Sequence, residues 1–242
     1  MNTLVAGIDG CKGGWIAVEA DGGAVTGSSF VLSLGDYLFG PDAPAIIAID
    51  IPIGLTDTGP RECDPIARRL LGQRRSSVFP APIRPALAAR SREEASAISH
   101  QIQGKGVGAQ AFGIYEKIRE VDALLCDHPE LRNRVFEIHP ELCFAALGAG
   151  KMPALPATLA PMIHPKRSGQ GFVERLTLIE AFFGPGAFDR IRTQHKNHVA
   201  DDDILDAIAA TWTALRVRSG QAESIPDPPS IDGLGLPMAM WF

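Results

Sequence analysis

The pattern of apolar and polar positions predicts strands in the first part of the chain. Residues 4–8 form a short, almost continuous apolar run, which is typical of a strand buried on both faces, and the run ends at Asp9. A glycine-rich turn then leads into a second strand at Trp15–Val18. Another turn precedes a third strand at Ala24–Leu32. We therefore expect a three-stranded antiparallel meander.

A second apolar run ends in a carboxylate in the same way. Ser33 can cap a short helix through Phe39, and Ala45–Ile51 is then apolar except for Asp50. A strand reached through a helical crossover pairs parallel with an earlier one, so Asp9 and Asp50 are expected at one sheet edge. Neighbouring strands lie ~4.8 Å apart, and two carboxylates at that spacing repel unless one is protonated or a cation bridges them. For Asp9 alone, a turn-initiating role remains the alternative.

Residues 53–134 read as a mostly helical insertion. We predict helices at Glu62–Leu71, from Ser91 to about Gln103, and at Ala111–Leu125. The proline-rich stretch 73–85 is expected to be a loop.

The last part of the chain reads as a short strand followed by helices. Val135–His139 is the predicted fifth strand, 148–170 a loop, and Phe172–Phe183 a helix that is followed by a broken region to Val199. The last long helix begins at Asp201, and a proline-rich tail from Ile225 is expected to cross the surface.

Two acids on the last helix need more than a capping role. Asp201 and Asp202 are ordinary residues for a helix start. Asp206 lies one turn further in, where Asp is a poor helix former, and it shares a face with Asp203. Together with Asp9 and Asp50 they make four candidate ligands for Mg²⁺ or Mn²⁺, which prefer carboxylate oxygens. Two such ions ~4 Å apart can support phosphodiester hydrolysis.

The charge is unevenly distributed along the chain. The net charge of −5 does not indicate a nucleic-acid binder by itself. Residues 61–119 nevertheless carry a balance of about +6 and the remainder about −11, as counted along the sequence. A basic segment beside an acidic site favours an anionic partner, and solvated helix faces are the alternative.

The cysteines and the apolar pattern favour a cytoplasmic protein. No stretch approaches the ~20 apolar residues of a membrane span, and the N-terminus lacks the pattern of a signal peptide. The cysteines show no metal-binding or disulfide spacing, and we expect reduced thiols at Cys11, Cys63, Cys126 and Cys143.

The order of elements resembles the RNase H-like fold, a mixed five-stranded α/β sheet flanked by helices, here as one domain with a helical insertion. G-I-D-G…G-W-I-A-V and D-I-L-D-A-I-A are similar to the first hairpin and closing helix of RuvC-type Holliday-junction resolvases. The chain more specifically resembles a bacterial and archaeal family of predicted RNase H-like nucleases. Its motifs, as they stand here, are G-I-D-G-C-K-G-G-W, A-I-D-I-P-I-G-L, R-E-C-D-P-I-A-R, V-F-P-A-P, E-I-H-P-E and D-D-I-L-D-A.

The resemblance implies a metal-dependent nuclease with particular site residues. The implied metal ligands are Asp9, Asp50, Asp203 and Asp206, with Asp202 able to replace Asp203. Glu137 of the E-I-H-P-E string is a further catalytic candidate, while cap and packing roles remain open for His139 and Glu141. Candidate substrate contacts are Lys12, Arg68, Arg74, Arg75, Arg84, His139 and Lys166.

Some features of the sequence leave other interpretations open. Arg61, Asp64 and Arg68 lie about one helical turn apart, so they could equally form an internal ion-pair ladder. The second acid of the resolvases is usually Glu, whereas Asp50 is shorter. The alternatives to a nuclease are a catalytically silent nucleic-acid- or nucleotide-binding module and a relative of actin-like ATPases and sugar kinases. No second G-x-D-G hairpin supports the latter.

Overall fold

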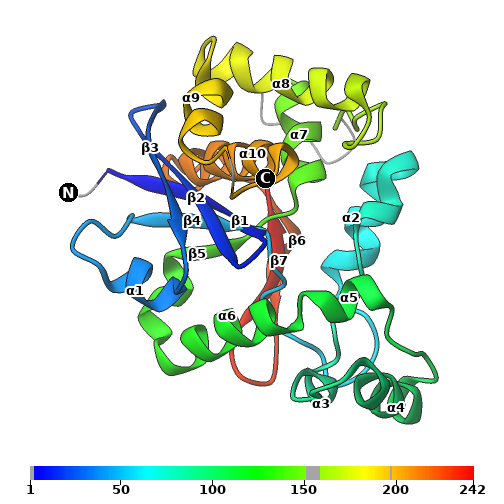
Figure 1. Cartoon of the computed structure of the whole chain (residues 1–242). Helices are drawn as coiled ribbons and strands as arrows, with labels where there is room; N and C mark the ends of the chain where they lie inside the picture. Colours follow the sequence, from blue (N-terminus) through cyan, green and yellow to red (C-terminus); the bar gives the residue numbers. More distant parts are fainter. Residues whose placement is uncertain (1–2, 151–158, 197) are drawn as a thin grey trace.

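The computed structural model describes residues 3–150, 159–196 and 198–242, and its centre is a five-stranded sheet (Figure 1). The strand order is β3-β2-β1-β4-β5. β2 is antiparallel to β1 and β3, whereas β4 is parallel to both β1 and β5, which confirms the predicted meander and parallel fourth strand. The strands are β1 Val5–Cys11, β2 Gly14–Asp21, β3 Ala24–Val31, β4 Ile46–Ile49 and β5 Val135–Glu137.

The first strand is longer than its apolar run predicts. β1 continues past Asp9 to Cys11, and Asp9 lies opposite Ile16 of β2. The turn therefore consists of Lys12 and Gly13, and Gly13 adopts a positive φ of 82° that only glycine takes up readily. Pairing with β2 keeps the backbone extended after the apolar pattern has stopped.

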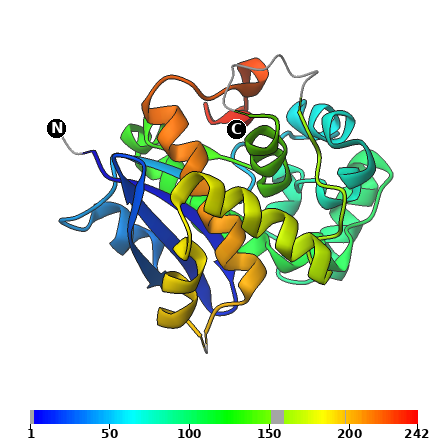
Figure 2. The same ribbon diagram turned by 90° about the horizontal axis from the view of Figure 1, so that it is seen from above.

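The helices form a layer on each face of the sheet. The α-helices are α1 Leu34–Phe39, α2 Cys63–Leu71, α3 Arg84–Leu87, α4 Arg92–Gln103, α5 Ala109–Gly113, α6 Tyr115–Asp127, α7 Pro140–Gly148, α8 Gly169–Phe183, α9 Ala187–Gln194 and α10 Asp201–Arg218. Short 3₁₀ segments are η1 Gly72–Ser77 and η2 Pro129–Asn133. Helices α10, α8 and α9 pack on one face, and α1 and α6 pack on the other (Figures 1 and 2).

The last long helix is buried over most of its length. Every residue from Ile204 to Leu215 is buried, because α10 lies between the sheet and helices α7 and α8. Its backbone touches that of β1 at Gly7, where an added Cβ would lie 2.0 Å from the Thr211 nitrogen and 2.3 Å from the Ala207 oxygen. Glycine at this position therefore fixes where α10 crosses the sheet.

Residues between β4 and β5 form helices and loops, and the predicted pattern differs from the structure at two places there and at one place after β5. The helix predicted at 111–125 is divided at Ile114 into α5 and α6, and the proline-rich stretch contains η1 and α3. The region expected to be broken before Val199 contains α9. Part of the predicted loop at 148–170 falls on residues 151–158, which lie outside the described residues. Because α6 contributes Ile118 and Val121 to the main core, the helical segment is integral to the fold.

The proline-rich tail forms a hairpin rather than an irregular crossing. β6 Ser224–Ile231 pairs with β7 Pro237–Trp241, and the pairing is interrupted between Ile225 and Ser230. The interruption accommodates the prolines of β6, since proline has no backbone N–H to donate.

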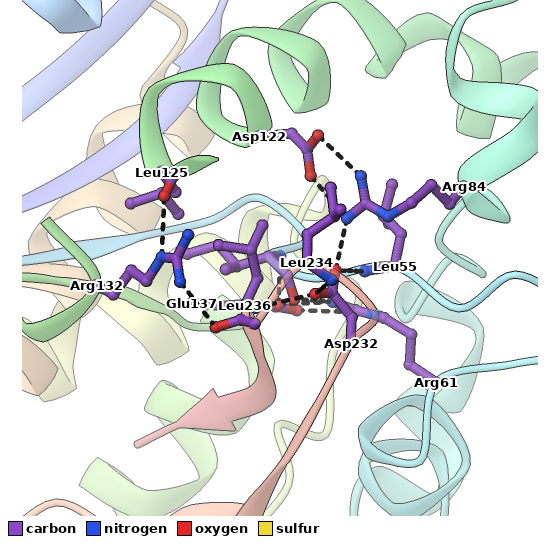
Figure 3. Close-up of polar contacts among 12 residues, drawn as sticks. Leu55, Arg61, Arg84, Asp122, Leu125, Arg132, Glu137, Asp232, Leu234 and Leu236 are labelled. Atoms are coloured by element: carbon purple, nitrogen blue, oxygen red, sulfur yellow. Dashed lines mark hydrogen bonds and ion pairs between the residues drawn. The ribbon is translucent and has the colours of Figure 1, made fainter. Parts of the chain in front are cut away.

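A carboxylate in the hairpin turn ties the tail to the segment that follows β4. Asp232 accepts hydrogen bonds from the backbone N–H groups of Leu55, Leu234 and Leu236, at 2.8 to 3.0 Å (Figure 3). Arg84 bridges Asp232 and Asp122. None of the described helices has the length and apolar character that crossing a bilayer requires.

Candidate functional site

Three predicted acids converge where β1 and β4 run side by side. The parallel register ends at Ile8 opposite Ile49, and the Asp50 N–H donates to the Ile8 carbonyl at 3.0 Å. Asp9 and Asp50 follow at the same level, and their side chains share a hydrogen bond. Such a bond between two carboxyl groups requires one of them to hold a proton. The crossing of α10 at Gly7 brings Asp206 to the same place.

The electrostatics of this acid cluster, Asp9, Asp50, Asp203 and Asp206, disfavour negative charge. Burial, followed by the charges of Asp50 and Asp206, raises the pKa of Asp9 well above its ordinary value. Burial and Asp206 raise the pKa of Asp50 to about 8, and burial and Asp202 raise the pKa of Asp203 to about 6. Near neutral pH the cluster therefore retains protons unless a cation compensates its charge.

A lysine supplies part of that compensation. The Lys166 ammonium lies 2.7 Å from the Asp206 carboxylate and 3.6 Å from that of Asp202. Burial opposes the charge of Lys166, but the attraction of Asp206 prevails and raises its pKa. Lys166 thus lies beside the acids that the sequence predicts as metal ligands, and it neutralises Asp206 directly.

The donor chemistry of the cluster suits a hard divalent cation. Carboxylate oxygens are preferred ligands of Mg²⁺ and Mn²⁺, and mutual repulsion favours cation uptake. Among the described residues, however, no three acidic, histidine or cysteine side chains are arranged so as to hold one ion. Lys166 binds the Oδ2 atom of Asp206, so a cation that binds this oxygen competes with the lysine.

The carboxylate of Glu137 is engaged in a separate ion-pair network (Figure 3). It lies opposite Ile49 in the β4–β5 register, one residue out of phase with Asp50, so the two side chains point to opposite faces of the sheet. Glu137 accepts two hydrogen bonds from Arg61, at 2.6 and 2.8 Å, and one from the Ile53 N–H at 2.7 Å. Arg61 also pairs with Asp64. Glu137 is therefore held in a buried ion pair with Arg61, its negative charge also raises the pKa of Asp50, and its catalytic role stays a prediction.

The predicted substrate contacts divide into two groups. Arg84 is held by two carboxylates, and Arg68 donates twice to the Val78 carbonyl, at 3.1 and 2.8 Å. Neither Arg74 nor Arg75 of η1 forms an ion pair within the described part of the chain. Lys12 is exposed at the tip of the first hairpin.

His139 lies between the acid cluster and η1. Burial lowers the pKa of His139 to about 4, so its ring is neutral and Nε2–H donates to the Ser77 carbonyl at 3.3 Å. Nδ1 has no hydrogen-bond partner among the described residues. The positive charge of Lys166 also lowers the pKa of His139. His139 is therefore placed near the acids by position and anchored to η1 by its hydrogen bond.

The sequence interpretation did not single out two basic residues near the cluster, Arg175 and Lys117. Arg175 of α8 is buried and pairs with Glu141, and its charge also reaches Asp206. The sequence did contain a sign that Arg175 is buried, because it shares a buried helical face with Gly171 and Ile179. Lys117 of α6 lies over the Trp15 ring at 4.2 Å and near the chain at Gly10, a contact that its local sequence does not indicate.

The comparisons with known proteins give one match. The model of a family described as "Protein of unknown function (DUF429)" matches residues 7–231. The matched range contains all four acids of the cluster and reaches into β6. No curated protein and no solved structure is similar enough to be matched.

Proposed function

Since the chain belongs to the family described as "Protein of unknown function (DUF429)", we propose its function from the acid cluster: a Mg²⁺- or Mn²⁺-dependent phosphodiester hydrolase acting on nucleic acid. The observation that carries the proposal is the convergence of Asp9, Asp50, Asp203 and Asp206 from three separate elements. Acids gathered for structure alone would be paired with cations, as Glu137 is with Arg61. Within the described residues, the only ion pair formed by these four acids is that of Asp206 with Lys166.

The order of strands supports a finer assignment of the fold. The order β3-β2-β1-β4-β5, with only β2 antiparallel to the others, agrees with the RNase H-like arrangement that the sequence resembles. In that fold, acids at the ends of the first and fourth strands and on the closing helix form the metal site. Fold similarity alone does not define chemistry, so the proposal rests on the cluster.

The residues of the cluster have distinct expected roles. Bound Mg²⁺ or Mn²⁺ would supply an activated water and stabilise the leaving oxygen of a phosphodiester. Asp9 and Asp50 would hold the cation from the sheet, and Asp203 and Asp206 would hold it from α10. Lys166, once released from Asp206, is within reach of a substrate phosphate beside the cluster.

Asp9→Asn tests the proposal, because Asn preserves the shape of Asp but removes its charge. Wild type should hydrolyse bis(4-nitrophenyl) phosphate or an oligonucleotide with Mn²⁺, and D9N should lose at least about 100-fold of that rate. Mn²⁺ at a hundred times its dissociation constant should stabilise wild type by ~2.7 kcal/mol, and D9N should gain less. Asp42→Asn, at an exposed acid before β4, is the matched control and should behave as wild type.

A binding module without catalysis is the second candidate, and the Lys166–Asp206 ion pair favours it. An ammonium already held at 2.7 Å can substitute for a metal and make the cluster a purely electrostatic element. If wild type neither gains stability with Mn²⁺ nor cleaves any phosphodiester, the hydrolase proposal fails and this candidate replaces it.

A further inference from the structure

One exposed aromatic side chain lies on a loop that Arg68 and His139 hold by hydrogen bonds. Phe79 is 45% exposed, whereas the preceding Val78 is buried in an apolar cluster. Arg68 holds the Val78 carbonyl by two hydrogen bonds, and His139 binds the Ser77 carbonyl. Pro80 and Pro82 follow and stiffen the backbone. The ring is therefore presented to solvent by a loop that is fixed on both sides.

The environment of Phe79 differs from that of another exposed phenylalanine. Phe39 is 50% exposed, and its ring packs against His128 with centroids 4.6 Å apart. Within the described residues, Phe79 pairs with no aromatic ring and belongs to no apolar cluster. Its face is thus open to a flat partner from outside the chain.

Two arginines lie a few residues before this ring in the sequence. Arg74 and Arg75 precede it in η1, and Arg75 is exposed. The buried Nε of Arg74 has no hydrogen-bond partner among the described residues. An aromatic ring beside guanidinium groups is the combination by which proteins bind unpaired bases and their phosphates.

The loop and the acid cluster are connected through α7. The Ser77 carbonyl is hydrogen-bonded to His139, the residue before α7. In the first turn of α7, the charge of Asp206 raises the pKa of Glu141 and the charge of Arg74 lowers it. A strand bound along η1 and Phe79 would therefore lead toward the acids.

We propose that Phe79 stacks on an unpaired base of a single-stranded nucleic acid whose adjacent phosphates are bound by Arg74 and Arg75. The inference deepens the proposed function, on which it rests, by assigning single strands as the substrate class. Duplex bases are already stacked on their neighbours, so they cannot offer a free face to Phe79 without being unstacked. Stacking on one aromatic side chain contributes about 1–3 kcal/mol per base, equal to about 5- to 150-fold in affinity.

The test measures binding without hydrolysis. Fluorescence anisotropy in EDTA compares a labelled single strand of about 12 nucleotides, the same strand with abasic sites, and the duplex. Wild type should bind the single strand more tightly than the other two. Phe79→Ala should weaken single-strand binding at least about 5-fold and remove the preference over the abasic strand. Phe79→Trp should retain it, and Phe39→Ala should leave binding unchanged.

The outcomes separate this inference from the proposed hydrolase. Equal affinity for the normal and abasic strands, unchanged binding by F79A in a protein of unchanged melting temperature, or no binding at all would each overturn it. If wild type hydrolyses bis(4-nitrophenyl) phosphate with Mn²⁺ but shows no base preference, the inference fails and the hydrolase proposal stands. If binding depends on Phe79 but no diester is cleaved, the hydrolase proposal fails and single-strand binding at Phe79 stands.

Discussion

Two buried carboxylates of this protein, Glu137 and Asp50, lie in different electrostatic environments. Glu137 faces the guanidinium of Arg61, whose charge offsets part of the cost of burying the carboxylate, although burial still leaves the pKa of Glu137 raised. Asp50 instead faces Asp9 and Asp206, and its charge is unfavourable without a further cation. Removing a carboxylate should therefore have opposite effects on stability at the two places.

Glu137→Gln should destabilise the protein, by about 3 kcal/mol, because Arg61 then keeps only Asp64 as a buried counter-charge. Asp50→Asn should be neutral or stabilising in EDTA. Urea unfolding of both variants measures the difference. The assignment of Glu137 to a structural pair would be wrong if E137Q kept wild-type stability but lost its response to Mn²⁺.

The pH dependence of stability should also report on the cluster. The pKa of Asp50 is about 8 in the folded protein, against an ordinary value of 3.8, so the folded protein holds a proton that the unfolded chain releases first. The resulting stability is fully present below about pH 4 and is lost as pH rises to about 8. In EDTA, wild type should lose at least about 1 kcal/mol more than D50N between these limits, or about 2–4 °C in melting temperature. A difference between the two proteins that does not change with pH would contradict this expectation.

Sequence patterns located the acids but not all of their partners. Asp9 and Asp50 were predictable because each interrupts an apolar run, and Asp206 because it lies too deep in a helix to be a cap. The partner of Glu137 was not predictable, because Arg61 is 76 residues away and the pairing depends on how the helical segment folds back.

At the scale of elements, the contact between β1 and α10 determines the geometry of the cluster. The backbone of β1 at Gly7 touches the backbone of α10 at Ala207, the residue after Asp206. No side chain therefore lies between the two elements. The relative position of Asp9 and Asp206 is therefore set by main-chain contact.

Gly7→Ala should displace α10, because its Cβ would meet backbone atoms at 2.0 and 2.3 Å. We expect a loss of about 1–3 kcal/mol in stability and weaker Mn²⁺ binding, measured by urea unfolding and by metal titration. Gly10→Ala is the matched control on the same strand, since its Cβ would approach side chains rather than backbone: the flexible Lys117 at 2.9 Å and the Trp15 ring at 3.7 Å. Comparable losses in both variants would show that β1 is sensitive to any side chain and that the α10 contact is not special.

Elements with strong periodicity were predicted, and elements stabilised by distant contacts were not. The capped helices α1 and α4 agree with prediction because Ser33 and Ser91 accept local hydrogen bonds. The β6–β7 hairpin was missed because prolines argue against a strand, and its pairing depends on Asp232 contacts with Leu55 and Arg84. Such long-range hydrogen bonds leave no trace in local sequence.

At the scale of the whole molecule, charge is separated between the acid cluster and the helical segment between β4 and β5. Within that segment, many arginines are engaged by the fold, as Arg61 and Arg84 show. The excess of positive charge available to a partner is therefore smaller than the composition suggests. Arg74 and Arg75 form no ion pair within the described part of the chain, and the Ser77 carbonyl of the same 3₁₀ segment is hydrogen-bonded to His139.

Charge reversal of Arg74 and Arg75 together should weaken binding of a polyanion and flatten its salt dependence. Each phosphate that the protein no longer neutralises lowers the slope of log affinity against log salt by about one unit, so we expect a decrease of about two. Arg90 and Arg92, near the start of α4, provide a control double reversal with the same change in net charge. An equal decrease in the control would assign the effect to net charge rather than to η1.

The packing of α10 on β1 also determines when the protein can fold during its synthesis. β1 and β4 leave the ribosome well before α10, the helix that covers one of their faces and carries Asp203 and Asp206. Until then the central strands expose apolar surface, and a nascent chain in this state is open to aggregation and dependent on chaperones. The acid cluster can therefore assemble only once α10 has been synthesised, so a nascent chain that still lacks α10 has only half of the acids that the proposed chemistry requires.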